Sequence, residues 1–280
     1  MITLASDFGS AYPAAMKGVI LSKTDARLVD VAHDLPRQDV RTAAFWLRET
    51  LPYFPPATHL AVVDPGVGTD RRAVVLRVGD HVFVGPDNGV LRPPARRIEA
   101  ESNEESPVET KGDGESPVKT EGDGDTPVEA YEIHVPDPDS TTFHGRDVFA
   151  PAAADAHVVG ADALDTIDRF EALSVDSLTD LRFPVADIDV DATTARGEVL
   201  VVDDFGNCLT NVPGSFVRGH DTVSVNGEPV PVGHTFEAVE RGERLVTVGS
   251  HGNVECDVNH GRGDEAFGLV PGDTLTLTVK

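Results

Sequence analysis

The chain has 280 residues, enough to bury a sizeable core in one large domain or two ordinary ones. Its 48 Asp and Glu residues outnumber 23 Lys and Arg residues, and the formal net charge of -25 argues against a nucleic acid or a membrane surface as partner. The two cysteines, Cys208 and Cys256, do not form a CxxC motif, so the sequence indicates neither a disulfide framework nor a thiolate metal site.

The first part of the chain alternates strand-like and helix-like segments, which predicts an α/β fold with a mainly parallel sheet. Ligands of such sheets usually lie beyond the carboxyl ends of the strands, where the motifs SDFG, VAHD and VVDPGVG fall. The expected strands are residues 2–5, 26–36, 58–68, 73–80 and 81–91, and the expected helices are residues 12–22 and 39–54.

Residues 99–130 interrupt this pattern with a ten-residue repeat, ESPVETKGDG, ESPVKTEGDG and the start of a third copy. The repeat is dominated by acidic residues, Gly, Pro and Thr, so it offers too little apolar surface to offset chain entropy. We predict an acidic disordered insertion here. The α/β pattern resumes at Tyr131, and FHGRDVFAPAAADAHVVG predicts a turn into an Ala-rich helix.

After Phe183 the pattern changes to short strands separated by Asn-Gly and Gly turns, as in DTVSVNGEPV and DTLTLTVK. Regular spacing of this kind predicts an all-β domain, a small barrel or sandwich. We therefore expect an N-terminal α/β domain over residues 1–185 and a C-terminal barrel-like β domain over residues 190–280.

The acidic residues are spread along the chain, and Lys, Met and Tyr are few, a composition typical of a high-salt cytoplasm. The start of the chain lacks a basic leader followed by an apolar stretch, and no run of about 18 apolar residues occurs. We expect a halophilic, cytoplasmic protein.

Two short segments carry candidate catalytic residues. In AVVDPGVGTDRRAVVL, Asp64 ends an expected buried strand, and Arg71 follows within reach of its carboxylate. In TFHGRDVF, His144 stands between an aromatic residue and a Gly-Arg-Asp turn. An Asp at a strand end often caps a turn, an exposed Asp–Arg pair contributes under about 1 kcal/mol, and an isolated His is more often a packed residue than a catalyst. Neither segment alone indicates an active site.

Eight motifs, however, occur in the order in which their counterparts occur in one family. They are SDFG, MKGVI, VDVAHDLPRQDVRTAAF, VVDPGVGTDRRAVV, FVGPDNGVL, TFHGRDVFAP, DDFGNCLTN and VGSHGNVECDVNHG. With these motifs the chain resembles the S-adenosyl-L-methionine (SAM) hydroxide adenosyltransferases, the SAM hydrolases related to the bacterial fluorinase and chlorinase. The resemblance covers nearly the whole chain apart from the insertion, and it implies hydrolysis of SAM to adenosine and L-methionine by attack of an activated water or hydroxide on ribose C5′.

The resemblance further implies a triad of Asp64, Arg71 and His144 that handles the water. Arg72 is the alternative to Arg71, and the family's spacing from Asp64 favours Arg71. An imidazole can take the proton of the water near neutral pH, a carboxylate can orient the water, and an arginine can stabilise a hydroxide-like species. The sulfonium of SAM already activates C5′, so the scheme requires no metal and no cofactor, SAM being the substrate.

The resemblance also implies substrate contacts. Asp7 matches the acceptor of the ribose diol, a role that suits a bidentate carboxylate, although a loop cap is the alternative. The loop after Asp7 is shorter than expected for the family, which leaves a contact from Tyr12 in doubt. His33 lies in a matching motif, and a structural role is the simpler expectation for it. The other implied contacts, to adenine and to the methionine amino and carboxylate groups, are Asp203, Asn207, Phe236, Ser250, Glu255 and Val258.

Two other functions stay open at this point. The halogenase relatives have a serine where this chain has Gly145, and a Tyr in place of His144, so water is favoured over halide as the nucleophile. A halogenase forming 5′-chloro-5′-deoxyadenosine is nevertheless an alternative, and a SAM- or nucleoside-binding module is another.

The resemblance also implies a homotrimer with sites at subunit interfaces.

Overall fold

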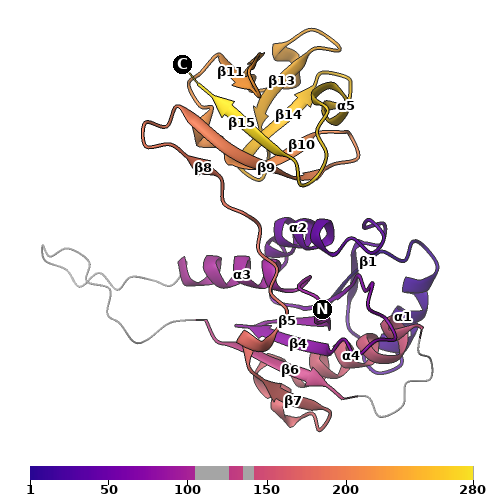
Figure 1. Cartoon of the computed structure of the whole chain (residues 1–280). Helices are drawn as coiled ribbons and strands as arrows, with labels where there is room; N and C mark the ends of the chain where they lie inside the picture. The colour runs from indigo at the N-terminus through magenta and orange to yellow at the C-terminus, as the bar shows by residue number, and fades with distance from the viewer. Residues whose placement is uncertain (105–125, 135–141, 280) are drawn as a thin grey trace, which may run out of the picture. The chain divides into compact units, whose positions relative to one another are not determined.

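The computed structural model describes residues 1–104, 126–134 and 142–279, and it divides the chain into two compact units, Met1–Arg182 and Phe183–Lys280 (Figure 1). The repeats expected to be disordered lie largely outside the described residues. Both edges of the predicted insertion are ordered, however, because helix α3 (Arg92–Glu104) covers its first residues and strand β6 (Val128–Ile133) its last. Ile98 on α3 is buried and Arg97 pairs with Glu101 one turn later, so the helix runs further than the composition predicted.

The first unit contains a seven-stranded sheet in the order β2-β1-β3-β5-β4-β6-β7. Strands β2, β1, β3 and β5 are paired in parallel, whereas β4 and β7 are antiparallel to their neighbours. The predicted α/β class with a parallel sheet is confirmed, and the parallel half positions the motifs discussed below. The strands not yet delimited are β1 (Ile2–Ser6), β2 (Leu28–Ala32), β3 (Thr58–Val62), β4 (Ala73–Val78), β5 (His81–Pro86) and β7 (Phe170–Leu173).

Helices cover both faces of this sheet (Figure 1). Helices α1 (Tyr12–Leu21) and α4 (Ala150–Val159) lie on one face, and α2 (Val40–Thr50) and α3 lie on the other. Helix α2 begins at the N-cap Asp39, which accepts a hydrogen bond from the backbone N–H of Thr42. Such a cap satisfies one of the free donors of the first helical turn, which explains where α2 starts.

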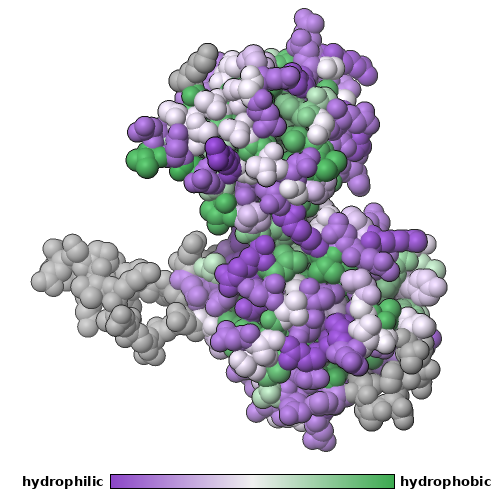
Figure 2. Space-filling model, viewed as in Figure 1, coloured by the Kyte–Doolittle hydropathy of each residue, from purple (hydrophilic) through white to green (hydrophobic). Residues whose placement is uncertain are grey.

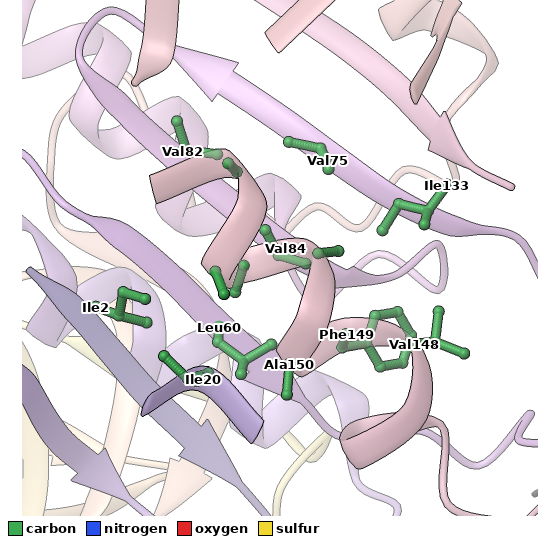
Figure 3. Packing of buried hydrophobic residues seen from close by; sticks show 14 of the residues in the cluster. Ile2, Ile20, Leu60, Val75, Val82, Val84, Ile133, Val148, Phe149 and Ala150 are labelled. Atoms are coloured by element: carbon green, nitrogen blue, oxygen red, sulfur yellow. The ribbon is translucent and has the colours of Figure 1, made fainter. Parts of the chain in front are cut away.

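The core beneath α4 is built from small and large side chains together. The alanines of α4 at 152, 153, 154 and 156 are fully buried, and small side chains let the helix approach the sheet closely. Val148, Phe149 and Ala150, which precede α4 or begin it, lie among the sheet residues Leu60 and Val84 (Figure 3). Each large apolar side chain buried here contributes about 1.5–3 kcal/mol, so the segment just after His144 is held firmly in place.

The second unit is a nearly closed, barrel-like antiparallel sheet, as predicted. Its strands follow the order β12-β11-β15-β9-β10-β14-β13, and the backbone N–H of Gly233 donates to the carbonyl of Val246 at 2.9 Å, which joins the segment after β12 to β13. The strands are β8 (Asp187–Ile188), β9 (Thr194–Val202), β10 (Cys208–Pro213), β11 (Thr222–Val225), β12 (Glu228–Pro231), β13 (Arg244–Val248), β14 (Asn253–Val258) and β15 (Thr274–Thr278).

The face of the molecule drawn in Figure 2 is dominated by hydrophilic residues, in line with the acidic composition. In the part of the chain that the structure describes, no helix is long and apolar enough to cross a membrane.

Candidate active site

Two of the predicted carboxylates follow neighbouring strands of the parallel half of the sheet. Strands β1 and β3 are paired in register, with Leu4 opposite Leu60 and Ser6 opposite Val62. Asp7 comes directly after β1, and Asp64 comes two residues after β3. The topology therefore brings both side chains to the carboxyl edge of the sheet, where ligands of parallel sheets bind.

Asp64 and Arg71 form a buried bidentate ion pair. Arg71 donates from Nε to Oδ1 of Asp64 at 3.0 Å and from Nη2 to Oδ2 at 2.5 Å. Their side chains are 9% and 4% exposed for Arg71 and Asp64, so this pair is better shielded from solvent than the surface pairs that contribute little. The Asp64–Arg71 pair is thus a fixed, desolvated charge arrangement.

The third predicted residue, His144, joins this pair. Nη2 of Arg71 lies 3.3 Å from Nδ1 of His144 in hydrogen-bonding geometry. An arginine side chain only donates hydrogen bonds, so Nδ1 must be the acceptor, and the neutral ring then carries its proton on Nε2. Asp64, Arg71 and His144 are therefore in contact, and the arginine fixes the tautomer of the imidazole.

Burial lowers the pKa of His144, and the positive charge of Arg71 lowers it further, against the opposing effect of Asp64 and Asp147. The ring is therefore neutral at neutral pH. His144 immediately precedes a five-residue π-helical turn, η2 (Gly145–Phe149), that leads into α4. The guanidinium of Arg71 lies over the ring of Phe149, 5.2 Å from its centroid, so the same turn that presents His144 also supports Arg71.

Arg72, the alternative to Arg71, is committed to another carboxylate. It donates to Oδ2 of Asp87 from Nε at 2.8 Å and from Nη2 at 2.5 Å. Asp87 also accepts from the backbone N–H of Thr179 at 2.7 Å. Arg72 thus ties the segment after β7 to the end of β5, while Arg71 alone of the two contacts Asp64 and His144 among the described contacts.

The FVGPDNGVL motif supports the strand end that carries Asp64, a role that the sequence did not reveal. Nδ2 of Asn88 donates to the carbonyl of Val63 at 2.8 Å, next to Asp64. A Cβ atom on Gly85 would lie 2.3 Å from the carbonyl oxygen of Ala61, so only glycine fits there. These contacts join the ends of β3 and β5, and among the described contacts the motif does not touch the Asp64, Arg71 and His144 side chains.

Gly145 sits in a packed environment beside the cluster. A Cβ atom at this position would lie 2.9 Å from Cε2 of Phe8, 3.1 Å from Cε2 of Phe143 and 3.2 Å from Sδ of Met16. The rings of Phe8 and Phe143 meet edge to face, with centroids 5.8 Å apart. The residues next to Asp7 and His144 are therefore in direct contact, and a serine at position 145 would need its neighbours to move.

In the second unit, the loop between β9 and β10 brings Asp203 and Asn207 together. Oδ1 of Asp203 accepts from the backbone N–H groups of Phe205 and Asn207 at 2.9 and 2.8 Å, and Oδ2 accepts from Nδ2 of Asn207 at 2.9 Å. The turn expected from an Asp-Asn pair is present, and it leaves the ring of Phe205 79% exposed. Phe205 was not among the predicted site residues. The feature that could have identified it is an aromatic residue inside the polar turn motif DDFGN.

The remaining predicted residues of the second unit are distributed along two other segments. Phe236 is partly exposed in a short 3₁₀ helix (Phe236–Ala238), and Ser250 is exposed in the turn between β13 and β14. Glu255 pairs with Nε2 of His251 at 2.9 Å, and Val258 is buried at the end of β14. The ring of His251, for which the sequence suggested no role, thus lies beside the carboxylate of Glu255.

The chain is similar to known proteins over nearly its whole length. Residues 2–167 match the family model of the SAM hydroxide adenosyltransferase N-terminal domain, and residues 197–276 match that of the C-terminal domain. A protein of Salinispora tropica named (R)-S-adenosyl-L-methionine hydrolase is 37% identical over 282 residues, covering 99% of this chain and 97% of the relative. A protein of Thermus thermophilus with the same name is 40% identical, covering 97% of both chains. The crystal structure of an uncharacterized conserved protein from Thermotoga maritima is similar over 100% of both chains, with a TM-score of 0.73 and 29% identity.

Proposed function

The chain belongs to the SAM hydroxide adenosyltransferase family, its reaction is the hydrolysis of SAM to adenosine and L-methionine, and we propose that Asp64, Arg71 and His144 activate the attacking water. The observation that supports this assignment is the partly buried contact of a carboxylate, a guanidinium and a neutral imidazole at the carboxyl edge of the parallel strands. Of the functions considered, only attack by water makes use of all three groups.

The reaction places a defined demand on the site. An oxygen lone pair of water forms the bond to C5′, the C5′–S bond breaks with its electron pair going to sulfur, and one proton leaves the oxygen. The sulfonium is already a good leaving group, so the protein must chiefly position the water in line with sulfur and receive the proton.

We propose a division of these tasks that differs from the expectation that His144 is the base. Nδ1 of His144 has a single lone pair, and the hydrogen bond from Arg71 occupies it. Oδ2 of Asp64 accepts one hydrogen bond, from Nη2 of Arg71, and each carboxylate oxygen can accept two. We assign proton acceptance to Asp64, and we assign to the Nε2–H group of His144 a hydrogen bond to the water oxygen.

The charges support this division of roles. A water between the Nε2–H group and Oδ2 would have one lone pair directed by the donor and one proton directed to the carboxylate. Arg71 balances the charge of Asp64 before the reaction and stabilises the arrangement in its desolvated setting.

The substrate contacts are assigned by the family resemblance. Asp7 would hold the ribose diol, and Asp203 with Asn207 would hold the methionine amino group and the adenine edge. Phe236, partly exposed, would cover the adenine. Ser250, Glu255 and Val258 would contact the methionine carboxylate and adenine, in part through backbone groups.

We further propose that the enzyme is a cytoplasmic homotrimer that needs no cofactor and prefers the (R) epimer of SAM at sulfur. The epimer preference is supported by the names of the Salinispora and Thermus relatives. Light scattering after size-exclusion chromatography measures the oligomeric state, and separate incubation with each SAM epimer measures the preference.

Product analysis tests the function. Purified enzyme incubated with SAM should yield adenosine and L-methionine in equal amounts on chromatography, and this yield should depend on Asp64. Formation of 5′-chloro-5′-deoxyadenosine in chloride buffer would support a halogenase instead, and unchanged SAM would support a binding module.

A further inference from the structure

A chain of polar side chains lies beside the Asp7 loop, outside the cluster described above. Oγ of Ser6 is 2.8 Å from Nδ1 of His33, and Nε2 of His33 is 2.9 Å from Oδ1 of Asp30. Nζ of Lys17, on helix α1, donates to Oδ2 of the same aspartate at 2.6 Å. His33 is thereby connected to strands β1 and β2 and to helix α1, and its side chain is 15% exposed.

This order of residues resembles a Ser-His-Asp relay, but the serine cannot act as a nucleophile. Ser6 is completely buried in the last position of β1. A nucleophilic hydroxyl must reach the reacting atom of a substrate. The chain of hydrogen bonds is therefore not a nucleophilic triad.

His33 holds the chain on both sides of Asp7. Its side chain contacts Ser6, the residue before Asp7, and its backbone carbonyl accepts a hydrogen bond from the N–H of Gly9, two residues after Asp7, at 2.7 Å. Gly9 has a positive φ of 73°, so the chain turns sharply at this point. The Asp7–Phe8 segment is thus clamped at both ends by one residue.

The loop that follows His33 also contacts Asp7 directly. The backbone N–H of Gln38 donates to Oδ2 of Asp7 at 2.8 Å. Gln38 has a φ of 61°, in the left-handed region that residues with a side chain seldom adopt. The unfavourable backbone conformation of Gln38 directs its N–H to the carboxylate of Asp7. Such strain is retained where it serves function, which indicates that the orientation of this carboxylate is functionally important.

We propose that His33 is a positioning residue that fixes the carboxylate of Asp7 for the ribose diol of the substrate. This inference rests on the proposed role of Asp7. His33 acts through Ser6 and Gly9, while Gln38 orients Oδ2, which directs the remaining lone pairs of the carboxylate to the ligand.

A matched pair of substitutions separates the two contacts of the ring. The amide of asparagine reaches about as far as Nδ1 of histidine, so His33→Asn keeps a partner for Ser6 and loses the contact with Asp30. The amide of glutamine reaches about as far as Nε2, so His33→Gln keeps a partner for Asp30 and loses the contact with Ser6. His134→Ala is the control, because His134 is an exposed residue of the same unit whose described side-chain partner is Glu171.

The readout is competitive inhibition of SAM hydrolysis by adenosine and by 2′,3′-dideoxyadenosine, which lacks the diol. Asp7→Ala should weaken inhibition by adenosine roughly 10- to 100-fold and leave inhibition by the dideoxy compound unchanged, as expected for loss of hydrogen bonds to a charged group. His33→Gln should reproduce most of this selective loss, while His33→Asn and His134→Ala should stay within about threefold of wild type. Adding His33→Gln to Asp7→Ala should cause no further loss, because His33 acts through the interaction that Asp7→Ala has already removed.

The outcomes separate this inference from its premise. If Asp7→Ala weakens adenosine and His33→Gln does not, or if His33→Gln weakens both nucleosides equally, the positioning role is overturned and the role of Asp7 stands. If Asp7→Ala leaves adenosine unaffected, the ribose assignment fails and the positioning role fails with it. Thermal unfolding checks the fold of each variant, and Ser6→Ala, which removes only the hydroxyl, gives the same test if the His33 variants do not fold.

Discussion

One guanidinium nitrogen of Arg71 donates a hydrogen bond to Nδ1 of His144 at 3.3 Å. The arginine that neutralises Asp64 thus also determines which imidazole nitrogen carries a proton. The proposed division of roles follows from this contact, with His144 as a donor and Asp64 as the proton acceptor.

Substitutions at His144 distinguish a donor from a base. Glutamine places a neutral N–H donor near the position of Nε2 and cannot accept a proton at neutral pH. We expect His144→Gln to keep kcat within about 10-fold of wild type and His144→Ala to lose about 100-fold or more at saturating SAM. Equal losses in the two variants, measured by adenosine release, would return His144 to the role of base.

Removal of the charge of Asp64 should abolish most of the turnover. Asp64→Asn preserves the shape of the side chain but weakens proton acceptance, so kcat should fall at least about 100-fold while the Kd for SAM changes little. Asp87→Asn is the matched control, because it also deprives a neighbouring arginine of a well-buried carboxylate. Both variants should melt at lower temperature than wild type, since each leaves an arginine uncompensated, but only Asp64→Asn should lose turnover. A large loss in both would mean that the ion pairs serve stability alone.

The buried side chain of His59, which lies against His81, predicts how stability depends on pH. Burial lowers the pKa of His59 to about 3, and the nearby His81 contributes to the shift. The unfolded chain binds a proton at His59 below pH about 6.5, whereas the folded chain does not until pH about 3. As the pH falls from about 6.5 to about 3, protonation of His59 in the unfolded chain should therefore lower the free energy of unfolding by about 1.4 kcal/mol per pH unit.

His59→Asn removes this titration. Urea unfolding at constant salt gives the free energy of unfolding of wild type and variant at pH 7 and at pH 5. The difference between the two proteins should be smaller at pH 5 than at pH 7. A difference that does not change with pH would show that His59 is not kept neutral by the fold.

Deletion of residues 106–125 should preserve both folding and turnover. The flanking residues Asn103 and Thr126 are joined directly, with the N–H and the hydroxyl of Thr126 donating to Oδ1 of Asn103 at 2.9 and 2.8 Å. A short linker can therefore replace the deleted residues without strain on the sheet. The melting temperature and kcat of the deletion variant test this, and a folded but inactive variant would place the deleted residues in the site.

The sequence predicted those features that depend on local spacing. Asp64 and Arg71 are seven residues apart across one turn, so their pairing could be foreseen, and period and turn signals identified both fold classes. The reversed direction of β4 and β7 could not be foreseen, because a strand pattern carries no information about its partner's direction.

Features that depend on contacts between distant parts of the chain could not be predicted from the sequence. Ser6 and His33 are in contact because β1 and β2 lie side by side in parallel. The sequence gives no sign of this contact, so it predicted only a structural role for His33. The tautomer of His144 depends on an arginine 73 residues away in the sequence, so it could not be predicted from the motif around His144. The last residues of helix α3 were assigned to the insertion because their composition is acidic and polar. The burial of Ile98, which holds this helix against the rest of the unit, depends on the tertiary fold.

We propose that water attacks C5′ of SAM, and reaction in ¹⁸O-labelled water with molar chloride tests this proposal most directly. Mass spectrometry of the product should find one ¹⁸O atom in adenosine, at the 5′ oxygen, with little 5′-chloro-5′-deoxyadenosine, because Gly145 offers no hydroxyl to a halide and the negative charge of Asp64 disfavours an anion nearby. Adenosine without the label at the 5′ oxygen, or a chlorinated nucleoside as the main product, would contradict hydrolysis by an activated water.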